Sequence, residues 1–176
     1  MKRNKMLIIT GVSASGKTVL QEDMLQRGFN KPINFTTREP RYEDEVDDYV
    51  FLDEDRFIYL LRKDIFIDHT NWYWNWYGIS RTMPKWDICM VLDPIWREQI
   101  AKWISRDDYD VKFVYLDIDE KLQTKRLNTR WDSKDQRALR KKDFEWFSPS
   151  ASSVVLDGAI DTNILADKIK NSWEHL

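Results

Sequence analysis

The feature that most constrains the fold is the loop Gly-Val-Ser-Ala-Ser-Gly-Lys-Thr at residues 11–18. It directly follows the apolar run at residues 6–10, which is typical of a strand buried on both faces of a parallel sheet. Its glycines permit unusual backbone dihedral angles, and its inward-pointing N–H groups form an anion site together with a helix N-terminus. The residues and the strand–loop–helix context both match a phosphate-binding P-loop.

This loop predicts the ligands of a nucleoside triphosphate. Lys17 would bridge the β- and γ-phosphates of ATP, and the Thr18 hydroxyl would be a ligand of Mg²⁺. ATP and Mg²⁺ are therefore the expected cofactors. The loop alone leaves kinase, ATPase and GTPase open, although the Asn-Lys-x-Asp segment expected of a GTPase does not occur in the sequence. The other predicted ATP-binding residues are Gly11, Ser13, Ala14, Ser15 and Gly16.

Composition excludes several other classes of protein. A chain of 176 residues with a net charge of -2 suits one domain and argues against a protein that mainly coats nucleic acid. Its one cysteine, Cys89, cannot build a disulfide framework or a zinc site. No apolar stretch approaches the length of a membrane span, and residues 1–5 lead into a strand without a signal-peptide core. We expect a cytoplasmic protein without a membrane partner.

Strand and helix patterns alternate along most of the chain, which predicts an α/β fold with a parallel sheet flanked by helices. The segment from about 34 to 80 breaks the alternation and is predicted to be an inserted, small mixed-β lobe that binds substrate. The core would then comprise about 1–33 and 81–176 of a single domain. Strands are expected at 6–10, 33–35, 49–52, 66–68, 88–92, 112–117 and 153–156, and helices at 17–27, after Asp53, and at 94–105, 120–129, 134–146 and 162–173.

Further strings resemble those of guanylate kinases. Residues 35–41, Phe-Thr-Thr-Arg-Glu-Pro-Arg, and 48–51, Asp-Tyr-Val-Phe, are similar to that family's Thr-Thr-Arg-x-Pro-Arg and Asp-Tyr-x-Phe. Phe-Ile-Asp at 66–68, Trp-Tyr-Gly-Ile-Ser at 76–80, Leu-Asp at 92–93 and Lys-Arg-Leu at 125–127 follow in the family's order. The resemblance spans nearly the whole chain. It implies an ATP-dependent nucleoside monophosphate kinase of the P-loop NTPase fold, acting on GMP, dGMP or a related (deoxy)nucleoside monophosphate.

The resemblance assigns the acceptor phosphate to Arg38, Arg41, Tyr49 and Tyr77. Two arginines around a proline-stiffened turn can grip a dianionic phosphate bidentately, and pairing with neighbouring glutamates is the alternative.

The resemblance also implies a short helical lid over about 128–145. Arg130 and Arg140 would bring positive charge to the moving phosphoryl group, so the predicted catalytic residues are Lys17, Arg38, Arg130 and Arg140. Arg137 or Lys141 could replace Arg140, or the run could be a solvated helix face.

The sequence departs from the family where a guanylate kinase reads its base. Asn34 stands for a serine, Asp68 for the base-reading glutamate, Ile79 for a second serine, and Ile95 for an aspartate. Loss of polar partners should weaken the preference for guanine considerably. Asp93, at a strand end, could hold Mg²⁺ through water or anchor the acceptor, and a helix N-cap ahead of Pro94 is the alternative.

Four of the nine tryptophans lie between residues 72 and 86. In the hairpin beside the base pocket, alternation would place Trp72, Trp74 and Trp76 on one face. They could stack on a base or fill core volume. Two other functions stay open: a P-loop kinase acting on a nucleotide or hydroxylated base within DNA or RNA, and a non-catalytic guanylate-kinase-like binding module.

Overall fold

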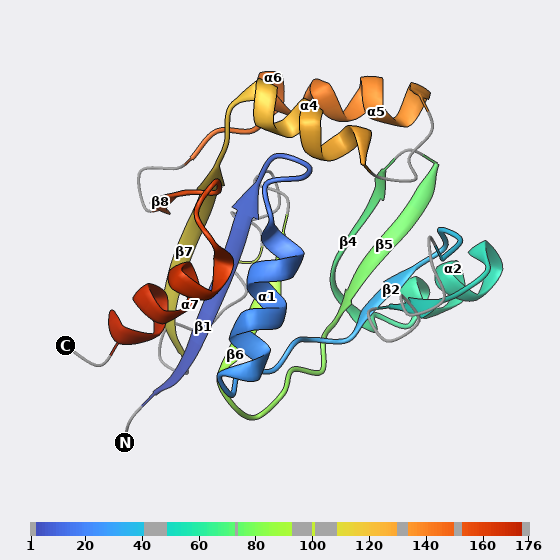
Figure 1. Cartoon of the computed structure of the whole chain (residues 1–176). Helices are drawn as coiled ribbons and strands as arrows, with labels where there is room; N and C mark the ends of the chain where they lie inside the picture. Colours follow the sequence, from blue (N-terminus) through green and yellow to red (C-terminus); the bar gives the residue numbers. More distant parts are fainter. Residues whose placement is uncertain are drawn as a thin grey trace.

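The structure is a computed structural model, and it describes residues 3–40, 49–72, 74–92, 100, 109–129, 134–149 and 153–173. Two sheets stand side by side, and helices α4, α5 and α6 lie across one end of the molecule (Figure 1). The elements are β1 (Asn4–Gly11), α1 (Lys17–Gln26), β2 (Asn34–Thr36), β3 (Val50–Phe51), α2 (Glu54–Arg62), β4 (Phe66–Trp72), β5 (Asn75–Ser80), β6 (Ile88–Val91), β7 (Tyr109–Asp117), α4 (Glu120–Asn128), α5 (Lys134–Lys141), α6 (Asp143–Trp146), β8 (Ser153–Asp157) and α7 (Thr162–Asn171).

The first sheet is parallel, with the strand order β6-β1-β7-β8. Strand β1 lies inside the sheet and is buried from Met6 onward, which explains its apolar run at residues 6–9. Leu7 and Ile9 pack into a cluster with residues of α1 and α7. Met6 and Ile8 face the opposite cluster, which contains Ile100. Apolar side chains therefore pack against both faces of this sheet, and these two clusters form the core.

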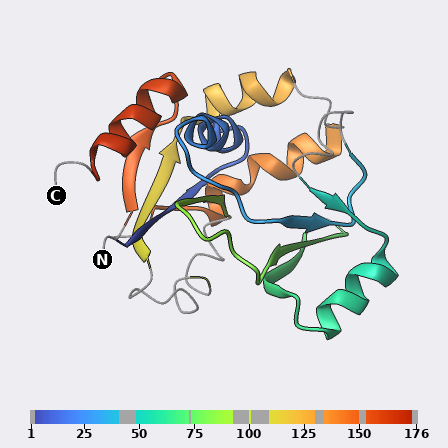
Figure 2. The same ribbon diagram turned by 90° about the horizontal axis from the view of Figure 1, so that it is seen from below.

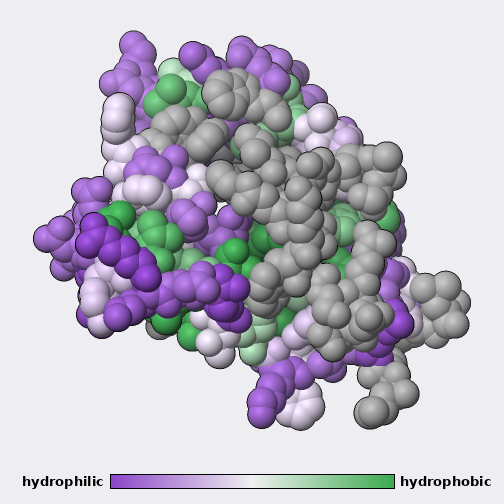
Figure 3. Space-filling model, turned by 180° about the vertical axis from the view of Figure 1, so that it is seen from behind, coloured by the Kyte–Doolittle hydropathy of each residue, from purple (hydrophilic) through white to green (hydrophobic). Residues whose placement is uncertain are grey.

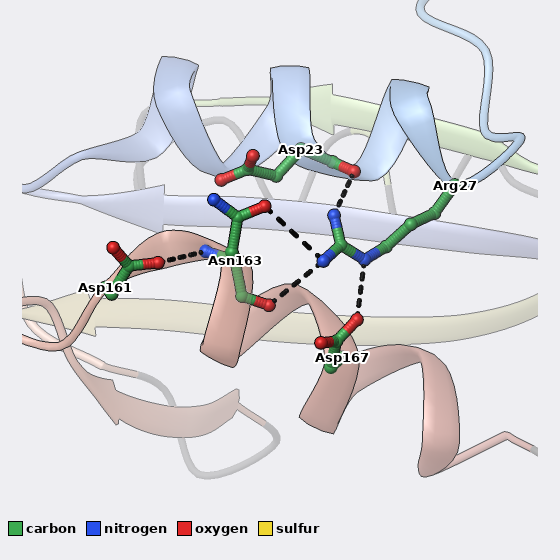
Figure 4. Close-up of polar contacts among 5 residues, drawn as sticks. All are labelled: Asp23, Arg27, Asp161, Asn163 and Asp167. Atoms are coloured by element: carbon green, nitrogen blue, oxygen red, sulfur yellow. Dashed lines mark hydrogen bonds and ion pairs between the residues drawn. The ribbon is translucent and has the colours of Figure 1, made fainter.

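Helices α1 and α7 are joined by Arg27, the residue that ends α1. Its guanidinium donates to the Asp23 carbonyl at 2.8 Å, to the Asp167 carboxylate at 2.8 Å and to the Asn163 carbonyl at 3.2 Å (Figure 4). In the same view Asp161 accepts from the backbone N–H of Asn163 and so caps the start of α7. These bonds fix α7 against the helix that follows the loop at residues 11–18.

The second sheet is mixed, with the order β3-β2-β5-β4. Strand β2 pairs parallel with β3 and antiparallel with β5, and β4 pairs antiparallel with β5. Phe57 from α2 stacks on Phe66 at 4.6 Å and on Trp76 at 5.7 Å between ring centroids. Figure 2 shows α2 beside this sheet, on the side away from the first sheet. The predictions of a parallel sheet flanked by helices and of an additional mixed-β part are confirmed.

Several expected elements differ in detail. The helix expected over 134–146 is two helices, α5 and α6, because the Lys142 N–H bonds to the Leu139 carbonyl and tightens the turn between them. The strand expected at 66–68 continues to Trp72, since it pairs along its length with β5. The helix expected at 94–105 lies outside the described residues except for Ile100, which is helical and buried.

The expected alternation of tryptophans is wrong. Trp72 pairs with Asn75 in the backbone register, so the chain reverses between them and the alternation is interrupted. Trp74 lies in this turn with a positive φ of 66° and is 95% exposed. Trp76 instead packs on Phe57, and its indole N–H donates to Glu54 at 3.2 Å. At least Trp76 therefore contributes to core packing.

One face of the molecule bears mostly polar groups in its described part (Figure 3). Seen from behind, hydrophilic residues cover much of the described part of this face, and hydrophobic residues appear only in small areas between them (Figure 3). Among the described residues, we find no helix with the length and apolar composition needed to span a membrane.

Candidate active site

The loop at residues 11–16 curls at the carboxyl end of β1, the edge where open parallel sheets bind ligands. Gly11, Ala14 and Gly16 have positive φ angles of 145°, 64° and 104°. A Cβ on Gly11 would lie 2.6 Å from the Leu116 carbonyl oxygen, so a side chain there would require the backbone to move. The Ser15 N–H bonds back to the Val12 carbonyl at 3.2 Å. This geometry provides the concave row of N–H groups that binds anions.

Lys17 and Thr18 begin helix α1 directly after the loop. The Lys17 ammonium donates to the carbonyls of Gly11 at 2.8 Å and Val12 at 2.9 Å, so its side chain folds back over the loop. Thr18 is exposed in the first turn of α1. All the predicted ATP-binding residues are thus contiguous at one helix N-terminus, where the helix dipole favours negative charge.

Helices α5 and α6 reach the same loop at Ser13. The Asp143 carboxylate accepts the Ser13 N–H at 2.7 Å and is buried. Arg140 donates from Nη1 to the Ser13 hydroxyl at 3.3 Å. The structure therefore brings predicted Arg140 to the loop, and it adds Asp143, which no sequence pattern indicated. The nearby Tyr115 hydroxyl has its pKa raised to about 12 by burial, with the charges of Asp117 and Asp143 adding to the effect.

Arg126 of α4 holds the other side of the loop. Its guanidinium donates to the carbonyls of Ala14 at 3.1 Å, Ser15 at 3.2 Å and Gly158 at 2.8 Å. Gln123, buried one turn earlier, donates to the Arg140 carbonyl at 3.1 Å and so ties α4 to α5. Arg126 belongs to the Lys-Arg-Leu string at 125–127, but the sequence predicted no functional role for it. Nothing in the sequence indicated Gln123.

Three of the predicted acceptor-binding residues, Asn34, Asp68 and Tyr77, lie on strands of the second sheet. Asn34 is opposite Ile79, which is opposite Asp68 on the next strand, so the three form one row across the sheet. Thr36 and Tyr77 are opposite each other two positions along. Because directly opposed residues, and residues two apart in a strand, share a face, the sheet brings Asn34, Asp68 and Tyr77 to one side.

Asp68 is the half-buried carboxylate of this row. Burial raises its pKa, and the hydrogen bond from the His69 N–H at 2.9 Å partly offsets the rise. Ionisation of this carboxyl group therefore costs more free energy than at a fully exposed aspartate, because burial removes part of its hydration.

Arg38 lies at the end of β2 beside β3. Its guanidinium is 5.7 Å from the ring centroid of Tyr49 and 5.9 Å from that of Phe51, and it donates to the Glu39 carbonyl at 2.7 Å. The structure thus brings together predicted Arg38 and Tyr49, held by a cation–π arrangement that includes Phe51. Predicted Arg41, Asp93 and Arg130 lie outside the described residues.

A sequence-family model described as Guanylate kinase matches residues 3–174. The chain belongs to the guanylate kinase family. The guanylate kinase of Chlamydia muridarum (strain MoPn / Nigg) is 34% identical over 184 residues, which cover 98% of this chain and 84% of that protein. The guanylate kinase of Legionella pneumophila (strain Paris) is 32% identical over 137 residues, covering 73% of this chain and 64% of that protein.

A solved guanylate kinase structure has the same fold. The guanylate kinase from Anaplasma phagocytophilum superposes with a TM-score of 0.68 at 19% identity, covering 99% of this chain and 87% of that one. The predicted P-loop fold is confirmed, as are the guanylate kinase family and the class of ATP-dependent nucleoside monophosphate kinase.

Proposed function

We propose that this guanylate kinase family member transfers the γ-phosphoryl group of ATP to GMP or dGMP. The observation that carries the proposal is the row Asn34–Ile79–Asp68 on the same face as Tyr77. Guanine presents an N1–H and an exocyclic amine, and the Asp68 carboxylate can accept both. The Asn34 amide can donate to the guanine O6 atom from the other end of the row. Relatives named as guanylate kinases support the same acceptor.

On the donor side, we propose that the N–H groups of the loop bind the ATP phosphates. The Lys17 ammonium would exchange the two loop carbonyls it now contacts for the β- and γ-phosphates. Thr18 fits a role as Mg²⁺ ligand because Mg²⁺ prefers oxygen and usually takes few protein ligands beside substrate phosphates. When bound, Mg²⁺ neutralises charge on the β- and γ-phosphates.

On the acceptor side, Arg38, Arg41, Tyr49 and Tyr77 would hold the phosphate of the nucleoside monophosphate. The cation–π contacts of Arg38 with Tyr49 and Phe51 support this role because they orient the guanidinium before the substrate arrives. Asp93 would complete this side, and Arg130 and Arg140 would complete the lid. The contact of Arg140 with Ser13 supports its place next to the donor phosphates.

The reaction needs no covalent intermediate with the protein. An oxygen of the acceptor phosphate forms a bond to the γ-phosphorus, and the bond from that phosphorus to the β–γ bridging oxygen breaks, giving ADP and a nucleoside diphosphate. The protein aligns the two substrates, and its arginines and Lys17 stabilise the charge of the transferring group. A lid that closes over the site also excludes water and so suppresses hydrolysis of ATP.

Ile79 distinguishes this base site from one lined by hydroxyl groups. It stands between Asn34 and Asp68, and its side chain offers no hydrogen bond to a base. We therefore expect this kinase to favour guanine over other bases by a smaller factor than a site with more polar contacts would.

ADP formation should be measured with each common ribo- and deoxyribonucleoside monophosphate as acceptor. We expect GMP or dGMP to give the highest kcat/KM. The Lys17→Ala variant should lose activity by roughly 100-fold or more while remaining folded, because it lacks the positive charge that stabilises the transferring phosphoryl group. Lys121→Ala, an exposed lysine of α4, is the matched control and should match the unmodified enzyme. Turnover with none of the acceptors would refute the proposed function.

A further inference from the structure

The segment at residues 139–147 rests on the phosphate loop through apolar contacts. Phe147 is buried against Val12 of the loop and Ile118, and Phe144 packs against the same cluster. The Tyr115 hydroxyl donates to the Phe147 carbonyl at 3.3 Å. Since these contacts involve only the chain itself, the segment is anchored before any nucleotide binds.

The same segment binds the backbone N–H and the hydroxyl of one loop residue, Ser13. Asp143 Oδ2 accepts the Ser13 N–H at 2.7 Å, and Arg140 Nη1 donates to the Ser13 hydroxyl at 3.3 Å. The Asp143 side chain is almost fully buried, since the residue is 5% exposed. A backbone N–H bound to an ionised carboxylate is roughly twice as strong a hydrogen bond as one between neutral groups. Ser13 is therefore hydrogen-bonded to both α5 and α6.

A carboxylate is an unexpected choice at this place. Burial of a charge costs free energy, and a negative charge beside a loop that binds a polyanion weakens binding by repulsion. A neutral side chain would avoid both costs while α6 stayed anchored by Phe144 and Phe147. What the carboxylate adds is a strong, directional bond to the loop backbone next to Arg140.

We infer that Asp143 is a positioning residue. It holds the phosphate loop and Arg140 in a fixed position relative to each other, so that ATP meets a preformed site. The inference rests on the proposed function for the role of Arg140. Asp143 acts through Ser13 and the α5–α6 segment and needs no contact with substrate. Without its carboxylate, the loop and the guanidinium of Arg140 could each move independently, and the alignment of the γ-phosphate would be lost.

The test compares Asp143→Asn, which keeps the size and one acceptor oxygen, with Asp143→Ala, which removes the acceptor. We expect kcat/KM for ATP to fall about tenfold in the Asn variant and more in the Ala variant, the range of a hydrogen bond to a charged group. The KM for GMP should change less than about twofold, because the substitution leaves the second sheet, where the proposed acceptor site lies, unchanged. A purely structural role would lower stability without this split between the two substrates.

A double-mutant cycle with Arg140→Ala tests the coupling. If Asp143 works by placing Arg140, the loss caused by Asp143→Ala is smaller when Arg140 is already absent. Additive losses would overturn the inference, as would unchanged kinetics in both Asp143 variants. Tighter ATP binding in Asp143→Asn would also overturn it, because the carboxylate would then be a competitor of the phosphates.

Asp119→Ala is the matched control. Asp119 likewise accepts a backbone N–H, that of Leu122 at 2.6 Å, but this bond caps α4 and does not involve the loop. We expect it to lower stability and leave kcat/KM for both substrates unchanged.

Direct calorimetric titration with ATP, without an acceptor, separates the two proposals. If the unmodified enzyme binds ATP but transfers to no nucleoside monophosphate, the proposed function fails, while the ATP affinities of the Asp143 variants still test the inference.

Discussion

Asp68 is the residue whose chemistry bears most directly on the acceptor base. Burial raises its pKa above the usual 3.8, so it takes up a proton at a higher pH than an exposed aspartate does. Under the proposed function, protonation removes the negative charge that would accept the N–H groups of guanine. At neutral pH Asp68 is ionised, and its burial then destabilises the folded state. This destabilisation is lost as the pH falls through the raised pKa.

The pH profile of kcat/KM for GMP checks this effect. We expect the profile to fall on the acid side with an apparent pKa above 3.8, and the Asp68→Asn variant to lose that limb and bind GMP more weakly by about tenfold. The KM for ATP should stay the same in this variant. An acid limb that persists unchanged in Asp68→Asn would show that another group titrates.

At the scale of elements, α4 is the helix that connects the phosphate loop with the turn after β8. Arg126 makes this connection by hydrogen bonds to the carbonyls of Ala14, Ser15 and Gly158. Arg126→Ala should therefore lower the free energy of unfolding by about 1–3 kcal/mol and raise the KM for ATP, because the loop loses its support. Denaturant unfolding and steady-state kinetics measure the two effects.

Two substitutions sharpen this prediction. Arg126→Lys keeps the charge but not the planar fork that reaches three carbonyls, so we expect it to resemble Arg126→Ala more than the unmodified protein. Lys125→Ala, an exposed neighbour on the same helix, should leave both quantities within experimental error. Full activity and stability in Arg126→Lys would mean that charge alone matters.

At the scale of the whole molecule, stability comes from the two apolar clusters on the faces of the parallel sheet. Leu165 of α7 is 1% exposed in one cluster, whereas its neighbour Ile164 is 52% exposed. Leu165→Ala should lower the free energy of unfolding by about 2–5 kcal/mol through lost burial and a cavity. Ile164→Ala should cost less than about 1 kcal/mol. Equal costs in denaturant unfolding would contradict this placement of the core.

The sequence by itself determined the parts of this protein whose signals are local. The loop at residues 11–18 is specified by neighbouring residues, because its glycine dihedrals and the helix after it depend on the chain close by. The N-cap at Asp53 is also local, since its carboxylate accepts the Arg56 N–H three positions on. The family strings identified the guanylate kinase family and the class of kinase. The predicted division into core, acceptor lobe and lid, and the roles of the site residues, stay predictions.

Only the tertiary structure decided which distant residues meet. Asp143 lies 130 positions from Ser13, and Arg126 lies 112 positions from Ala14, so no local pattern could join them. The row Asn34–Ile79–Asp68 exists because of strand register, which depends on pairing across the second sheet. The break at Lys142 turns a single expected helix into two, which places Arg140 on α5 and Asp143 on α6, both against the loop. Local patterns thus specify a phosphate loop, while packing between remote segments sets the side chains that hold it.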